Sequence, residues 1–279
     1  MKYKAIFCDF DGTLCQLPPV SKKNIEAVKS YVEKGGKFII TTGRIFQAAY
    51  PQILSFGVKM DRAIVSQGAQ VYDLDNIKPI TTFTIEDSLS KRISDSLIKF
   101  REKYTDLEAF MYLNEECYFS GNNLAFVDTF CDILKIKPKF TNSSLYEFIK
   151  KSNMYPTKFL AMINENDIDN FIKELNVELN NSAFICKSRG VLLEIMPKNV
   201  NKGTAVEQVC KEYGIMLNDV ICIGDSGNDV PMLQKAGLSC APSDASREVL
   251  DIVDYVSCKC DDGAVADIIK KYCLGDNND

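Results

Sequence analysis

The alternation of short apolar runs with helical segments at both ends of the chain restricts the fold more than any other feature. Near the N-terminus, strand-like runs at 3–8, 37–41 and 63–66 are separated by segments with helical character. The same alternation returns between residues 202 and 272. Strands connected by helices favour right-handed crossovers and a parallel sheet. We therefore predict an α/β domain with a Rossmann-like parallel sheet, to which both ends of the chain contribute.

The middle of the chain has a different pattern. Helices, including one expected at 124–134, are mixed there with strands at hairpin spacing, such as 109–113 and 117–120. This pattern predicts an antiparallel sheet with helices on one face. The sequence thus indicates a discontinuous α/β core of residues 1–83 and 190–279, into which an α+β domain of residues 84–189 is inserted.

The absence of His from a chain of 279 residues excludes several classes of enzyme. Ser-His-Asp and Cys-His hydrolysis and His-ligated zinc hydrolysis all require an imidazole. No Arg stands six positions after any of the 11 Cys, which excludes the nucleophilic loop of tyrosine phosphatases. Most of these Cys lie in apolar runs, and we expect buried free thiols. Carboxylates, hydroxyls, lysine and a hard metal ion remain as catalytic groups.

Charge and hydropathy indicate the setting in which the protein works. The formal net charge is −5, and the Lys residues are scattered among acids. A nucleic-acid partner is therefore not expected, because no basic cluster follows a phosphate backbone. No window of about 18 apolar residues and no signal-peptide pattern is present, so we expect neither a membrane span nor secretion. The prediction is a cytoplasmic protein that is a monomer or a weak homo-oligomer.

Two carboxylates follow the first strand directly. Asp9 and Asp11 stand two residues apart and are followed by Gly-Thr. The carboxyl ends of strands in open α/β sheets are where ligands bind. Two acids at that edge repel each other unless a cation joins them, which predicts bound Mg²⁺. The simpler alternative is a strand that runs into a surface Asp-Gly turn.

Three further motifs stand at the ends of strands or the starts of helices. Thr42 and Gly43 follow the second strand, where a hydroxyl and backbone N–H groups suit an anion. Lys202 stands near the start of a helix. Another apolar strand ends at Asp225 and is followed by Asn228 and Asp229 in a turn-rich segment. Each motif alone has a simpler interpretation: an ordinary helix cap for Thr42 and for Asp225, and for Lys202 a solvated side chain, which that position alone favours.

The four motifs together form a more specific pattern, because they fall in order on one sheet domain that is split by an insertion. This pattern resembles the haloacid dehalogenase superfamily of aspartyl-phosphate phosphohydrolases, and within it the Cof-type group (class IIB). That group has a large α/β cap domain inserted between the second and third motifs. The resemblance covers essentially the whole chain, and segments 66–69 and 193–195 match as well.

The resemblance implies a role for each residue of the motifs. Asp9 would attack phosphorus, and Asp11 would act first as general acid and then as general base. Mg²⁺ would be bound by the Asp9 side chain, the Asp11 backbone carbonyl and Asp225, and Asp229 would order the groups around it. The phosphoryl oxygens would be held by a larger set: the Phe10 backbone N–H, Thr42, Gly43, Lys202 and Asn228.

Two positions depart from the usual pattern of the group. Gln67 stands where the group has Asn, and this longer amide is expected to alter contacts near the leaving group. Asn199 stands where Gly is common, with little effect expected because Asn tolerates the left-handed backbone. Gln67, Arg44 and Arg189 are the candidates for substrate specificity.

The leading functional hypothesis is a Mg²⁺-dependent phosphatase, a hydrolase of phosphoric monoesters. Its substrate would be a small phosphorylated metabolite, with sugar phosphates first, and its intermediate an aspartyl phosphate. One alternative is a phosphomutase with the same chemistry but a sugar hydroxyl as acceptor. Another is a non-catalytic metal or phosphate sensor built on an inactive hydrolase core.

Overall fold

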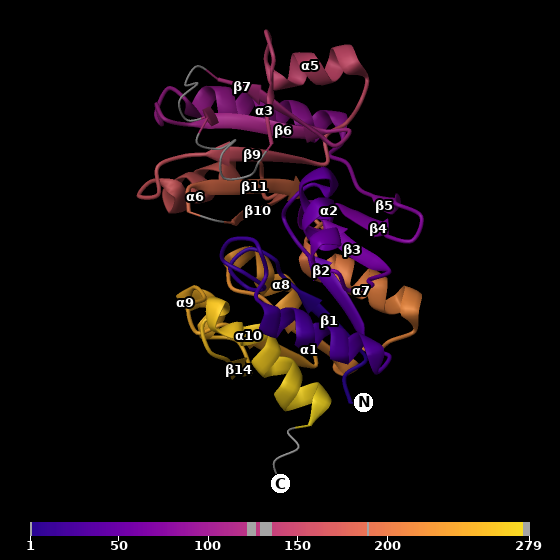
Figure 1. Cartoon of the computed structure of the whole chain (residues 1–279). Helices are drawn as coiled ribbons and strands as arrows, with labels where there is room; N and C mark the ends of the chain where they lie inside the picture. The colour runs from indigo at the N-terminus through magenta and orange to yellow at the C-terminus, as the bar shows by residue number, and fades with distance from the viewer. Residues whose placement is uncertain (1, 122–126, 129–135, 189, 276–279) are drawn as a thin grey trace. The chain divides into compact units, whose positions relative to one another are not determined.

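The computed structural model describes residues 2–121, 127–128, 136–188 and 190–275 (Figure 1). The chain divides into two compact units. The first unit is made of Met1–Gly43, Ala49–Thr81 and Asn201–Asp279, and the second of Arg44–Ala48 and Thr82–Val200. Each unit has its own sheet. An inserted second unit is thus observed, as the change of pattern along the sequence predicts.

The sheet of the first unit has eight strands in the order β14-β13-β12-β1-β2-β3-β4-β5. β1 lies in its middle and pairs in parallel with β2 and with β12, which come from opposite ends of the chain. The strands are β1 (Ala5–Cys8), β2 (Lys37–Thr41), β3 (Arg62–Val65), β4 (Gln70–Asp73), β5 (Lys78–Thr82), β12 (Val220–Ile223), β13 (Leu238–Ala241) and β14 (Tyr255–Val256).

The predicted α/β fold is confirmed, but the sheet is not parallel throughout. β4 runs antiparallel to β3, because the three-residue turn η1 (Ser66–Gly68) reverses the chain. The sequence reading did not predict β4 and β5. A short turn of this kind can only connect antiparallel strands, whereas parallel neighbours need a long crossover.

Helices α1, α2, α8 and α9 of the first unit lie between successive parallel strands of its sheet. α1 packs against α10, and α7 packs against α8. The helices and short helical turns are α1 (Lys22–Glu33), α2 (Phe46–Ser55, whose first residues belong to the second unit), α7 (Lys202–Tyr213), η2 (Leu217–Asp219), η3 (Gly227–Asp229), α8 (Val230–Leu233), α9 (Arg247–Leu250), α10 (Cys260–Ile269) and the π-helical η4 (Lys270–Leu274).

Caps fix the ends of the two longest helices of this unit. The Ser21 hydroxyl accepts the backbone N–H of Asn24 at the start of α1. Asn201 and Thr204 form a reciprocal capping box at the start of α7, and Gly214 ends that helix in the left-handed conformation. These are the signals that set helix boundaries in a sequence. The sequence pattern predicts a helix over 202–213, and α7 has these bounds.

Thiols fill part of the core rather than forming cross-links. Cys8 and Cys222 are fully buried on β1 and β12, and Cys222 packs in a cluster with Phe7, Ile39 and Val206. All cysteines among the described residues are free. The expectation of buried free thiols is confirmed for most of them, while Cys258 is exposed.

The second unit has six strands in the order β10-β11-β9-β6-β7-β8. All of its pairs are antiparallel except β7 with β8. The strands are β6 (Glu108–Leu113), β7 (Glu116–Ser120), β8 (Lys139–Phe140), β9 (Lys158–Met162), β10 (Ala183–Lys187) and β11 (Leu192–Pro197), and the helices are α3 (Asp87–Phe100), α5 (Leu145–Ser152) and α6 (Ile168–Glu178). The helix expected at 124–134 lies largely outside the described residues.

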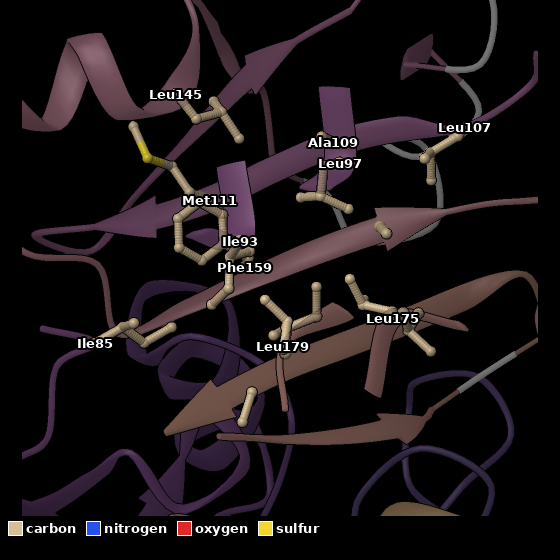
Figure 2. Packing of buried hydrophobic residues seen from close by; sticks show 14 of the residues in the cluster. Ile85, Ile93, Leu97, Leu107, Ala109, Met111, Leu145, Phe159, Leu175 and Leu179 are labelled. Atoms are coloured by element: carbon tan, nitrogen blue, oxygen red, sulfur yellow. The ribbon is translucent and has the colours of Figure 1, made fainter. Parts of the chain in front are cut away.

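One face of this sheet is covered by helices. Figure 2 shows side chains of the strands, such as Met111 and Phe159, turned toward side chains of the helices, such as Ile93 and Leu175. The alternation of β6 places Ala109, Met111 and Leu113 in this cluster, as the period of two in a strand requires. A six-stranded sheet with a continuous apolar layer can fold as a unit.

The second unit ends later than the sequence reading places it. β11 pairs with β9 and β10, so the unit continues to Val200, whereas the inserted domain was expected to end at 189.

None of the helices in the described part of the chain has the length and apolar character that a membrane span requires.

Gly68 allows a close approach that positions α7. Its φ is +95°, and a Cβ added there would lie 2.4 Å from the backbone oxygen of Asn201. We predict that Gly68→Ala lowers the free energy of unfolding by about 3 kcal/mol, because backbone strain and a clash with α7 add together. Urea denaturation measures this loss. The matched control is Gly35→Ala, where φ is +91° but no atom lies within 4 Å. Equal losses in the two variants would contradict the role of the close approach.

Candidate active site

The carboxyl ends of β1 and β12 bring two of the predicted acids together. The two strands are parallel neighbours, with Cys8 opposite Ile223. The Asp9 N–H donates to the Ile223 carbonyl over 2.9 Å, which continues the pairing one residue beyond the strands. Asp225 follows two residues after Ile223. Both acids are thus held at one edge of the sheet by backbone pairing.

A buried ammonium group joins two carboxylates at this edge. Lys202 Nζ lies 2.5 Å from Asp9 Oδ1 and 2.6 Å from Asp229 Oδ1. Lys202 is 0% exposed, and both carboxylates are buried. Lys202 is the first residue of α7, so the cap at Asn201 fixes where its side chain starts. The sequence pattern alone could not distinguish this Lys from a solvated one.

Both carboxylate oxygens of Asp229 accept hydrogen bonds from other groups of the protein. Its Oδ1 binds Lys202, and its Oδ2 accepts the backbone N–H groups of Asp225 (3.0 Å) and Ser226 (3.1 Å). These bonds hold the turn that follows β12. Asp229 thus connects Lys202 with the backbone of the segment that holds Asp225.

Two hydroxyl groups orient Asp225, and the sequence reading missed both. The Thr13 hydroxyl donates to Asp225 Oδ1 and the Ser226 hydroxyl to Asp225 Oδ2, each over 2.7 Å. Gly12 between Asp11 and Thr13 has φ +91°, and a Cβ there would lie 2.5 Å from Asp225 Oδ2. The Gly-Thr pair after Asp11 was visible in the sequence, but its contact with Asp225 depends on the pairing of β1 with β12.

The acids at the sheet edge could hold a metal ion. Carboxylate oxygens of Asp9, Asp225 and Asp229 lie within 4.8 Å of one another. A donor set made only of oxygen suits a hard divalent cation such as Mg²⁺. Asp229 accepts hydrogen bonds from Lys202 and from two backbone N–H groups, more than Asp9 or Asp225 accepts. The oxygens of Asp9 and Asp225 therefore have more capacity left for a cation.

Burial and charge shift the pKa values of these groups. Burial raises the pKa of Asp9 well above its usual value, although Lys202 acts in the opposite direction. Burial and the nearby Asp229 raise the pKa of Asp225 to about 6, against the effect of the Ser226 and Thr13 hydroxyls. Burial lowers the pKa of Lys202, but Asp229 and Asp9 outweigh burial and leave it raised. The two carboxylates thus stabilise the charged form of Lys202.

The remaining predicted residues lie around this cluster or outside the first unit. Thr42 is buried, and its backbone oxygen accepts the N–H of Gln67. Phe10 is buried directly after Asp9, while Asp11 and Gly43 are half-buried. Two of the three candidates for specificity are not placed at the cluster: Arg44 is grouped with the second unit, and Arg189 lies outside the described residues.

Gln67, the third specificity candidate, is placed in the first unit beside Asn228. Its side-chain oxygen accepts the Asn228 Nδ2–H over 3.1 Å. Both side chains are buried, and Asn228 precedes Asp229 directly. The structure thus connects the turn after β3 with the turn after β12.

Comparison with known proteins agrees with this geometry. The model of the haloacid dehalogenase-like hydrolase family matches residues 6–269. A protein of Buchnera aphidicola subsp. Schizaphis graminum, provisionally named a phosphatase, is 27% identical over 91% of this chain and 89% of its own length. The phosphoglycolate phosphatase of Methanobrevibacter smithii is 26% identical over 98% of this chain and 100% of its own. The solved structure of BT4131, described as a subclass IIB sugar phosphatase, has a TM-score of 0.80 at 22% identity, covering 96% of this chain and 98% of that one.

The buried ammonium of Lys202 is expected to be essential for stability when no metal is bound. In Lys202→Met, Asp9 and Asp229 stay buried without their cation, and we predict that the free energy of unfolding falls by about 3 kcal/mol at pH 7.5 in EDTA. The pKa of Asp9 rises further in this variant. The folded state then binds protons that the unfolded state releases, so the loss is smaller at pH 5 than at pH 7.5.

Urea denaturation at both pH values measures the effect of Lys202→Met. The control is Lys4→Met, which removes an exposed ammonium that is paired with Asp219. Little change is expected for this control, since exposed pairs contribute little. A Lys202→Met variant as stable as the control at pH 7.5 would disprove the account.

Proposed function

Because the chain belongs to the haloacid dehalogenase-like hydrolase family, we propose that it is a Mg²⁺-dependent phosphatase that hydrolyses monoesters of small phosphorylated metabolites. One observation carries the proposal: a buried Lys202 bridges Asp9 and Asp229, with Asp225 beside them. This arrangement brings a nucleophile, a cation and metal-binding oxygens together at one sheet edge. Each is needed to transfer a phosphoryl group.

Asp9 is the proposed nucleophile. Its carboxylate, which accepts a hydrogen bond from Lys202 at Oδ1, forms the bond to phosphorus. The bond from phosphorus to the ester oxygen breaks, and Asp11 donates a proton to the departing alcohol. Asp11 then accepts a proton from the water that attacks phosphorus, which releases phosphate and restores Asp9. One acid serves both steps, since the group that donates a proton is afterwards able to accept one.

Positive charge and hydrogen-bond donors offset the repulsion between the Asp9 carboxylate and the phosphate ester. Lys202 supplies a fixed charge that needs no reorganisation during the reaction. The backbone N–H of Phe10, Thr42 with Gly43, and the Asn228 amide are proposed to hold the phosphoryl oxygens. Asp9, Asp225 and the Asp11 backbone carbonyl would hold Mg²⁺, which supplies further positive charge beside the transferred group.

The substrate class is proposed to be sugar phosphates. The fold likeness to BT4131 and the family support a small phosphorylated metabolite, while the similarity to phosphoglycolate phosphatase supports a second substrate to test. Specificity is proposed to come from the second unit, to which Arg44 belongs, and from Arg189. A panel of hexose phosphates and phosphoglycolate, assayed for free phosphate, ranks these substrates. A hexose phosphate isomerised faster than it is hydrolysed would instead identify a phosphomutase.

Asp9→Asn tests the nucleophile with almost no change of shape. We predict that release of phosphate from a generic aryl phosphate falls by a factor of about a thousand or more, because an amide is a poor nucleophile. EDTA is expected to abolish the activity of the unmodified protein, and added Mg²⁺ to restore it. Melting temperatures measured with and without Mg²⁺ identify any loss caused by misfolding. Activity that survives both Asp9→Asn and EDTA would refute the proposal.

The pKa of Asp225 predicts how Mg²⁺ binding depends on pH. With a pKa of about 6, Asp225 is mostly ionised at pH 7 and mostly protonated at pH 5. A proton on this carboxylate competes with the metal, so the Kd for Mg²⁺ is expected to rise about tenfold or more from pH 7 to pH 5. Titration calorimetry measures the change. A Kd that stays constant over this range would show that Asp225 does not bind the ion.

A further inference from the structure

The turn after β3 contacts three of the segments that build the site. Ser66, Gln67 and Gly68 have consecutive positive φ values of 51°, 59° and 95°. The Gln67 N–H donates to the Thr42 carbonyl over 3.1 Å, and Gly68 lies against the Asn201 carbonyl at the start of α7. The Gln67 side chain reaches Asn228 in the turn after β12. One short turn thus touches the segments of Thr42, Lys202 and Asp229.

The backbone of Gln67 is held in an unfavourable conformation. A non-glycine residue in the left-handed region costs free energy, and such residues persist where the surroundings determine them. Strained residues gather at functional sites, so the strain calls for a reason that involves the side chain. At Gln67 the side chain is 1% exposed, and its oxygen accepts the Asn228 Nδ2–H.

The Asn228 amide has unused hydrogen-bonding capacity. Its side chain is 8% exposed, and Oδ1 is buried without a partner among the residues that the structure describes. A side-chain amide has two N–H donors and one acceptor oxygen, and Gln67 uses one of the donors. A buried polar atom without a partner points to a ligand or a water that completes it. Asn228 therefore has an N–H and an oxygen available for a bound molecule.

The torsion that turns an Asn amide is broad, so the amide needs a fixed partner to point in one direction. The bond from Asn228 to Gln67 Oε1 provides that partner. Asn at position 67 would be one methylene shorter and could not make the same bond from the same backbone. Asn also tolerates the left-handed region better than Gln does. A role in folding alone would thus favour Asn at this position, whereas a role in orienting Asn228 favours Gln.

We propose that Gln67 is a positioning residue, which turns the Asn228 amide so that its second N–H binds a phosphoryl oxygen of the substrate. The inference rests on the proposed function, because it uses the phosphate that the site is proposed to bind. It assigns Gln67 an action through Asn228, rather than direct contact with the leaving group.

The test compares Gln67→Asn, Asn228→Ala and the double variant. Gln67→Asn is expected to lower kcat for an aryl phosphate about tenfold, as residues that orient binding groups do. In the Asn228→Ala background, the same change is expected to lower kcat less than twofold, because the amide that Gln67 orients is gone. The matched control is Gln70→Asn, which makes the same change at a buried amide that bonds to Ser66 of the same turn. Its kcat is expected to stay within about twofold of the unmodified protein.

A binding measurement separates this inference from the proposed function. Calorimetry with inorganic phosphate in saturating Mg²⁺ is expected to show several-fold weaker binding for Gln67→Asn and no change for Gln70→Asn. If the unmodified protein hydrolyses no ester, the proposed function fails, and phosphate binding still decides the role of Gln67. If Gln67→Asn lowers kcat by the same factor in the unmodified protein and in the Asn228→Ala variant, the inference is overturned. Unchanged kcat and phosphate affinity in Gln67→Asn would overturn it as well.

Discussion

The contact on which the site depends is the buried bridge from Lys202 to Asp9 and Asp229. An ammonium ion and two carboxylates leave a net negative charge in a region where burial disfavours ions. Two backbone N–H groups that bind Asp229 share part of this charge, and two hydroxyls bind the neighbouring Asp225. The remaining negative charge suits a divalent cation. The arrangement that is costly for burial of the carboxylates therefore also suits a metal ion.

The residues of this cluster are brought together because the strands that carry them are neighbours in the sheet. β1 from the N-terminal end of the chain and β12 from the C-terminal end are direct neighbours in the sheet. Asp9 and Asp225 therefore lie close together although they are far apart in the sequence. The cap of α7 fixes Lys202, and the turn at Ser66–Gly68 packs on that cap. The second unit is inserted between segments of the first and has an apolar layer of its own.

The sequence predicts correctly those parts of the structure that are marked by short-range patterns such as apolar runs and helix caps. The strand before Asp9, the strand before Asp225 and the bounds of α7 follow from short apolar runs and from the Asn and Gly caps. β4 was missed because its pairing with β3 depends on the left-handed turn at Gln67, for which the sequence has no Asn-Gly signal. β11 was separated from the inserted unit because its partners, β9 and β10, are defined only by tertiary pairing. Thr13 and Ser226 were missed for the same reason, since a hydroxyl in a loop gives no indication of which carboxylate it will bind.

The central claim is that Asp9 carries the phosphoryl group during the reaction. The most direct measurement is to quench the protein with acid during turnover of a phosphate ester and to map the phosphorylated peptide by mass spectrometry. The account predicts a phosphate on Asp9 that hydroxylamine removes, as expected of an acyl phosphate, and that is absent from Asp9→Asn. A phosphate on another residue, or turnover by Asp9→Asn without any phosphorylated intermediate, would contradict it.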